Sequence, residues 1–294
     1  MKNLFKSILV FGAILLVSAA LSPLLHQFLP YKFEKIFNRL VMIFSLTALV
    51  VFLKGRQVRL SEYGLNWHGQ PAGKFILTGF LTGVLVLVIF SLVKVTAGQA
   101  VWIKPETGFI QWGCRLVGAL GAAFLIAIIE ECFFRGFIYQ TLSRRGQRLI
   151  SLACGITSLF YALVHFVSFE KPFVDSTPGF IDGLRLVAAP FLSLLQFGHY
   201  WPEALGLFIF GLVLNHAAVQ SCSLYPSIGL HAGCVFYVKT DALFLAFKNG
   251  NRLLFSSAKF YDGLLGWFFL SVIGIFLTAA IGRIQAEKAR TAHD

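Results

Sequence analysis

Two adjacent glutamates and an arginine stand in a strongly apolar stretch of the chain, FLIAIIEECFFRGFIYQ (124–140). An ionised side chain at the centre of a bilayer costs on the order of 3 kcal/mol, so such groups face the protein interior and usually serve function. Glu131 and Arg135 are spaced i, i+4, which places them on one helix face and predicts a charge pair. We interpret this pair as structural support for a site.

Glu130 lies about 100° around the helix from its neighbour and has no such cation nearby. In an apolar place, an isolated carboxylate binds its proton more tightly than an exposed one does. That property suits a general base working near neutral pH. Glu130 is therefore the first candidate catalytic residue.

His165 is predicted to lie at the depth of Glu130. The basic turn RRGQR (144–148) marks a membrane boundary, with Glu130 before it and His165 after it. At 1.5 Å rise per residue, the two side chains lie about 21 and 25 Å from the turn. In an antiparallel helix hairpin they can meet, and a Glu–His pair could hold and deprotonate a water molecule.

His231 lies in a third apolar segment, LYPSIGLHAGCVF (224–236), between Gly229 and Gly233. Small residues allow helices to approach closely in a membrane. At about 14 Å into its helix, His231 is compatible with the same cavity. Its expected role is to bind a substrate carbonyl or a developing oxyanion. The structural alternative for any intramembrane histidine is a hydrogen bond between helices.

The composition predicts a polytopic membrane protein. The chain is 57% hydrophobic and 13% charged, with a mean hydropathy of +0.77, whereas an ordinary soluble domain is about a quarter charged. The net charge of +12 comes from Lys and Arg in short connections such as 54–59 and 144–148. This distribution indicates orientation against anionic lipids and excludes nucleic acid as the partner. The five cysteines form no CxxC pair or zinc-type spacing.

The sequence predicts an all-α, polytopic transmembrane helix bundle with about eight spans. They are expected at 8–29, 36–53, 74–96, 114–138, 149–168, 203–221, 224–246 and 263–282. The first is interpreted as a membrane helix rather than a signal peptide, because its apolar run is long. A further stretch, 180–198, could cross, re-enter or lie in the interface.

Three motifs resemble those of the CAAX protease and bacteriocin-processing family, also called the Abi family. EECFFRG (130–136) resembles its EExxxR motif. SLFYALVH (158–165) resembles the second motif, FxxxH, with Tyr161 where Phe is usual. SLYPSIGLHAGCVF (223–236) resembles the third motif, HxxxN or HxxxD, centred on His231.

The resemblance covers about residues 113–245. Together with the apolar runs, it divides the chain into N-terminal membrane helices at 1–112, a catalytic helix core at 113–245 with an insertion-like segment at 169–202, and a C-terminal helix and tail at 246–294. All of these parts are expected to form one membrane domain. The eukaryotic relatives are similar to the type II CAAX prenyl endopeptidase.

The activity that the resemblance implies is that of an intramembrane endopeptidase acting on a membrane or lipid-associated protein. Glu130 and His165 would activate water, and His231 would stabilise the oxyanion. Glu131 and Arg135 would support the site. The protein would be a multi-pass integral membrane protein, in the plasma or inner membrane if prokaryotic. No cofactor is required in this interpretation, although Glu130, His165 and His231 could alternatively hold a catalytic zinc ion.

One position departs from the motif, because Val235 stands where Asn or Asp is expected four residues after His231. Valine donates no side-chain hydrogen bond, and losing one oxyanion donor costs about 10²–10³ in rate. Asn215 and His216 are candidate substitutes. The departure favours the main alternative, a non-catalytic relative acting as a scaffold, chaperone or immunity protein. A proton-coupled transporter is a third hypothesis, which the lack of an internal repeat disfavours.

Overall fold

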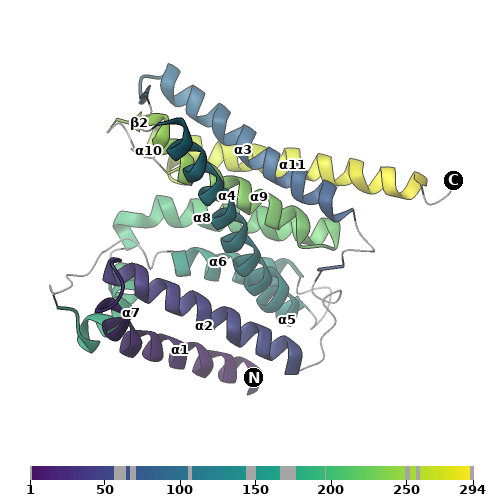
Figure 1. The fold of residues 1–294 in the computed structure, drawn as a ribbon. Helices are drawn as coiled ribbons and strands as arrows, with labels where there is room; N and C mark the ends of the chain where they lie inside the picture. The colour runs from purple at the N-terminus through teal and green to yellow at the C-terminus, as the bar shows by residue number, and fades with distance from the viewer. Residues whose placement is uncertain are drawn as a thin grey trace. The chain divides into compact units, whose positions relative to one another are not determined.

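The computed structural model describes residues 2–55, 64–66, 71–104, 108–143, 150–165, 177–195, 197–248, 252–255 and 259–291. Nearly all of these residues are helical, which confirms the predicted all-α fold (Figure 1). The basic clusters at 54–59 and 144–148 lie outside the described residues, except for Lys54 and Gly55. The chain divides into two compact units, which are described separately.

The first unit comprises residues 1–58 and 163–199. It contains α1 (Lys2–His26), α2 (Phe33–Gly55) and α7 (Phe180–Leu195). Helix α1 packs against both α2 and α7, and Gly183 of α7 lies against the backbone of Ala19. The stretch at 180–198, whose structure the sequence left open, is therefore mainly the helix α7.

The second unit comprises residues 59–162 and 200–294 and contains the two glutamates. Its elements are α3 (Ala72–Thr96), β1 (Ala100–Trp102), α4 (Phe109–Glu131), the π-helix η2 (Cys132–Tyr139), α5 (Gln140–Ser143), most of α6 (Ile150–His165) and of α8 (Phe197–Ser221), α9 (Tyr225–Thr240), the short 3₁₀ helix η5 (Asp241–Leu243), β2 (Leu245–Phe247), α10 (Arg252–Phe255) and α11 (Gly263–Thr291).

Five helical segments within the described residues are long and apolar enough to cross a membrane, and the protein is an integral multi-pass membrane protein. They are Leu9–His26, Ala72–Thr96, Ile110–Ser143, Tyr200–Ser221 and Gly263–Arg290. Helix α6 is apolar but has only 16 residues. The predicted count of eight spans is therefore not confirmed.

The predicted span at 224–246 is wrong at its C-terminal end, after residue 240. Helix α9 ends at Thr240, and η5 and β2 follow it. Strand β2 pairs antiparallel with β1, with Ala100 opposite Phe247. The connection to β1 begins just after α3 ends at Thr96, and its Gly98 has a φ of 72°. The next amide, Gln99 N, donates to Lys94 O at 2.8 Å, which closes the helix in the manner of a Schellman motif.

Helices α3 and α9 form the most extensive helix contact among the described elements, and glycines permit it. A Cβ atom added to Gly229 would overlap the carbonyl oxygen of Ile76, and one added to Gly233 would overlap that of Phe80. Gly79 on α3 faces α9 in the same way. Removing the side chains lets the two backbones touch, so these glycines fix the position of α9.

We therefore expect Gly229→Ala to destabilise the protein by about 3 kcal/mol, at the upper end of overpacking costs, because a backbone carbonyl cannot move aside as a side chain can. Thermal unfolding in detergent measures the effect. Gly282→Ala on α11 is the matched control, since nothing lies within 4 Å of its added Cβ. Equal unfolding temperatures for the two variants would contradict the packing role of Gly229.

Candidate active site

The two glutamates end α4, and the helix changes its hydrogen-bonding pattern directly after them. The π-helix η2 begins at Cys132 and contains Arg135. Such wide turns inside helices occur frequently at functional sites. The sequence contained no signal for this change. The acidic pair therefore lies at the junction between a regular and a widened helix.

Glu131 and Arg135 form the predicted pair. Nη1 of Arg135 donates to Oε1 of Glu131 at 3.1 Å, and both side chains are fully buried. Nη2 of Arg135 donates to the carbonyl oxygen of Gly211, on α8, at 3.1 Å. The arginine therefore joins η2 to α8 while it balances the charge of Glu131.

His231 of α9 bonds to the same carboxylate oxygen. Its Nδ1 lies 2.8 Å from Oε1 of Glu131. Because Glu131 is paired with a cation and acts as an acceptor, the imidazole carries its hydrogen on Nδ1. The other nitrogen, Nε2, lies 3.8 Å from Oε2 of Glu130. Glu131 thus orients the histidine, and Nε2 is the atom left for chemistry.

The two glutamates differ in accessibility. The side chain of Glu131 is 0% exposed and that of Glu130 is 27% exposed. Glu131, a fully buried carboxylate that accepts hydrogen bonds from Arg135 and His231, is suited to holding these two side chains in place. A carboxylate at the edge of the same network can meet a water molecule or a substrate. The different burial of Glu130 and Glu131 thus suits these two adjacent glutamates to different roles.

The net charge of this cluster depends on whether His231 is protonated. With both glutamates ionised and Arg135 protonated, the three groups sum to one negative charge. A protonated His231 would neutralise the cluster, and its Nε2–H could then donate a hydrogen bond. A neutral His231 with its hydrogen on Nδ1 could only accept at Nε2. Donation to an oxyanion therefore requires the imidazolium form.

Aromatic rings surround the buried charges. The guanidinium carbon of Arg135 lies 4.7 Å from the ring centroid of Tyr161. The His231 ring contacts Tyr161 and Phe210 edge-on, with centroids 6.1 and 5.8 Å apart. Aromatic faces stabilise a cation, and this shell keeps the charges among apolar neighbours.

His165 is the last residue of α6 and belongs to the first unit, because the division falls between Ala162 and Leu163. The other predicted site residues, Glu130, Glu131, Arg135 and His231, belong to the second unit. The pairing of Glu130 with His165 therefore stays a prediction.

Asn215 is engaged with α6. Its amide nitrogen donates to Oγ of Ser158 at 2.9 Å and to the carbonyl of Cys154 at 3.2 Å. A side-chain amide nitrogen has two hydrogens, so both are in use. This geometry disfavours Asn215 as the hydrogen-bond donor that takes the place of the side chain missing at Val235.

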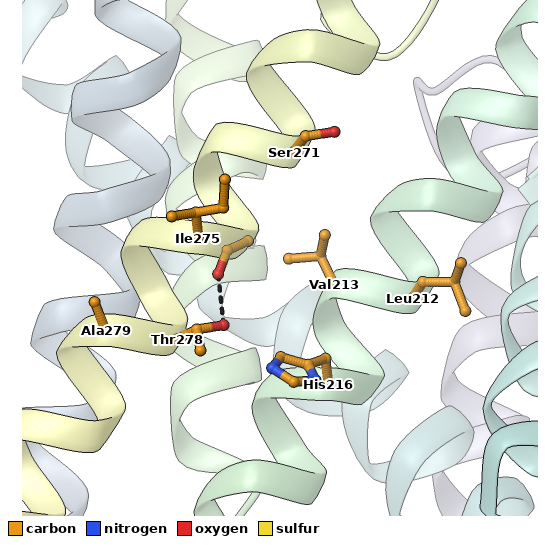
Figure 2. A pocket seen from close by; sticks show the side chains of 8 residues that line it. Leu212, Val213, His216, Ser271, Ile275, Thr278 and Ala279 are labelled. Atoms are coloured by element: carbon orange, nitrogen blue, oxygen red, sulfur yellow. Dashed lines mark hydrogen bonds between the residues drawn. The ribbon is translucent and has the colours of Figure 1, made fainter.

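His216 lies at a groove between α8 and α11, which contains no residue of α4 or α9. In Figure 2, its ring lies beside Val213, across from Ser271 and Thr278. With the described residues His216 forms no hydrogen bond, and the network of Glu131 does not include it. The groove is apolar apart from these few side chains, and the structure does not bring His216 to the glutamates.

A metal ion needs a converging set of ligands. Within the described ranges, no group of three His, Cys, Asp or Glu side chains could hold one. In His231, Nδ1 is already bonded to Glu131, so only Nε2 could be a ligand. The described residues therefore do not form a complete zinc site.

Sequence analysis did not single out one buried cation, Lys94, which falls near the end of the predicted span 74–96. Lys94 is 1% exposed in the last turn of α3. Its Nζ lies 4.5 Å from the ring centroid of Phe247 and interacts electrostatically with Asp262 and Asp241. Its position near the end of an apolar run resembled that of a snorkelling lysine. The cluster joins α3 to the β1–β2 end of the unit.

Helices that cross a membrane, with a Glu–His–Arg network buried among them, define the class to which this protein belongs: integral membrane proteins with an internal polar site. Residues 112–237 match the family model described as Type II CAAX prenyl endopeptidase Rce1-like. This confirms the resemblance to the CAAX protease and bacteriocin-processing family over that region, which includes all three motifs. Comparisons with curated proteins and with solved structures gave no match.

Proposed function

We propose that this protein is an intramembrane endopeptidase that cleaves a membrane or lipid-associated protein, with Glu130 as the general base. The observation that carries the proposal is the partly accessible Glu130 carboxylate at the edge of a sealed Glu131–Arg135–His231 network. The match of residues 112–237 to a family of endopeptidases supports the same reaction class.

In this function Glu130 removes a proton from a water molecule, which attacks the scissile carbonyl. When the C–N bond breaks, Glu130 returns this proton to the leaving amine. His165 assists by holding the water. His231, protonated and held by Glu131 through Nδ1, donates from Nε2 to the oxyanion. Stabilising that developing charge in a water-poor site is commonly the largest catalytic contribution. Arg135 holds Glu131 in place through their ion pair, so the network is ordered before substrate binds.

A quantitative census of protein termini in membranes tests this function. Cells make either wild type or Glu130→Gln at matched abundance. New termini that are present with wild type and disappear with the variant would establish the peptidase and identify its substrate. Identical termini in both samples would favour the second candidate function, a non-catalytic scaffold, chaperone or immunity protein, which Val235 supports.

We also propose that the reaction needs no metal ion, with zinc as the alternative. The donors of the Glu131–Arg135–His231 network support this, because among its described residues Glu130 and the Nε2 atom of His231 are the two ligands that are not already bonded to Arg135 or Glu131. Treating the membranes with EDTA or 1,10-phenanthroline is expected to leave the rate of Glu130-dependent cleavage within about twofold. Loss of cleavage that added Zn²⁺ restores would show that zinc takes part.

A further inference from the structure

Tyr161 lies on α6, in the same unit as the two glutamates, and is 1% exposed. Arg135 lies 4.7 Å from the centroid of its ring, and Phe134 meets the ring edge-on at 5.1 Å. The His231 ring is 6.1 Å away. With these neighbours the phenol ring has one defined position beside the site.

Among its charged neighbours, the Tyr161 hydroxyl interacts most strongly with Glu130, and less strongly with Arg135 and Glu131. Its ring borders the ring of the proposed oxyanion donor, His231, at 6.1 Å, and its hydroxyl lies in the electrostatic field of the proposed base, Glu130. The FxxxH motif that 158–165 resembles has phenylalanine at this position. A phenylalanine would supply the same ring contacts, so the hydroxyl is what this chain adds.

A hydrogen-bond donor is missing on α9. Val235 follows His231 by four residues in a regular helix, so the two share a face. Its side chain cannot donate where the resembled motif has Asn or Asp. A phenol is a neutral donor at physiological pH, since its ordinary pKa is about 10. A donor lost from one helix can therefore be supplied by another that borders the same site.

We propose that the Tyr161 hydroxyl is a catalytic hydrogen-bond donor to the oxyanion on the scissile carbonyl, in place of the side chain that Val235 lacks. This inference rests on the proposed endopeptidase function. The hydroxyl donates a hydrogen bond and transfers no proton, so His231 and Tyr161 together hold the oxygen while the water activated by Glu130 attacks carbon. Two donors are then available, as the chemistry of acyl transfer favours.

The test follows the rate at which Glu130-dependent termini appear in membranes of cells that make the full chain at matched abundance. Tyr161→Phe is expected to lower this rate about 10²-fold, the loss typical of one oxyanion donor. Adding Val235→Asn to that variant is expected to raise the rate at least about tenfold above that of Tyr161→Phe alone. Tyr237→Phe is the matched control, because it removes a buried hydroxyl that is bonded to Ser91, and its rate should stay at the wild-type value.

A Tyr161→Phe rate within about twofold of wild type would overturn the inference. So would a low rate that Val235→Asn does not raise, since the two donors would then not be interchangeable. If wild type and Glu130→Gln give the same termini, the proposed function fails and this inference fails with it. Should Tyr161→Phe not accumulate, 4-aminophenylalanine at position 161 must support faster cleavage than 4-fluorophenylalanine, because only the amine donates.

Discussion

Replacing Glu130 by glutamine is expected to abolish cleavage while the protein accumulates normally. The variant keeps the size of the side chain and loses its ability to accept a proton, and general-base catalysis contributes about 10²–10⁴-fold in rate. Glu130 is 27% exposed at the edge of the network, so losing its charge leaves the Glu131–Arg135 pair intact. A census of the protein termini that appear when the protein is made, together with the unfolding temperature in detergent, separates loss of cleavage from loss of folding.

Glu131→Gln is the matched control, one residue away and identical in chemistry. It leaves Arg135 buried without a full counter-charge and weakens the anchor of His231 Nδ1, so both stability and cleavage should fall. A Glu130→Gln protein that still cleaves would remove Glu130 from the role of base. A Glu131→Gln protein with an unchanged unfolding temperature would contradict the structural role assigned to Glu131.

Sequence analysis predicted the local part of this site. The i, i+4 spacing of Glu131 and Arg135 carries enough geometry to predict their pair, since any regular helix brings the two together. The hydrophobic runs likewise predicted most of the helices. Both inferences depend only on neighbours along the chain, where the backbone repeat is known in advance.

The contacts that give the site its character are long-range. His231 is 100 residues from Glu131 in sequence, and Gly211 is 76 from Arg135. No spacing rule predicts which carboxylate oxygen the imidazole meets, or that a backbone carbonyl accepts from the guanidinium. The assignment of His231 to the glutamate cavity came from estimated depth and from motif resemblance, and neither contained the Glu131 bond.

The packing of α3 on α9 explains how that long-range bond is held. Gly229 and Gly233 flank His231 and let α9 lie directly on the backbone of α3. The histidine therefore projects from a helix that is fixed on its other side. In an apolar solvent without a hydrophobic driving force between helices, such close packing supplies much of the association energy. Stability and site geometry thus depend on the same glycines.

Arg135→Ala is expected to cost about 3–5 kcal/mol of stability, the range measured when one member of a buried ion pair is removed. Four contacts disappear together: the bond to Glu131, the bond to the carbonyl of Gly211, and the cation over the rings of Tyr161 and Phe134. The Glu131 carboxylate then stays buried with His231 as its remaining partner. Thermal unfolding in detergent and the yield of folded protein measure the loss.

The double variant Glu131→Gln/Arg135→Met distinguishes an unpaired charge from lost packing. It removes both charges and keeps most of the buried volume, and replacing a buried pair by neutral groups is frequently close to neutral in free energy. It should therefore unfold at a higher temperature than Arg135→Ala, while cleavage remains lost because Nδ1 of His231 no longer has a charged carboxylate to hold it in place. If Arg135→Ala instead unfolds like wild type but no longer cleaves, Arg135 acts on the substrate itself, and the supporting role assigned to it is wrong.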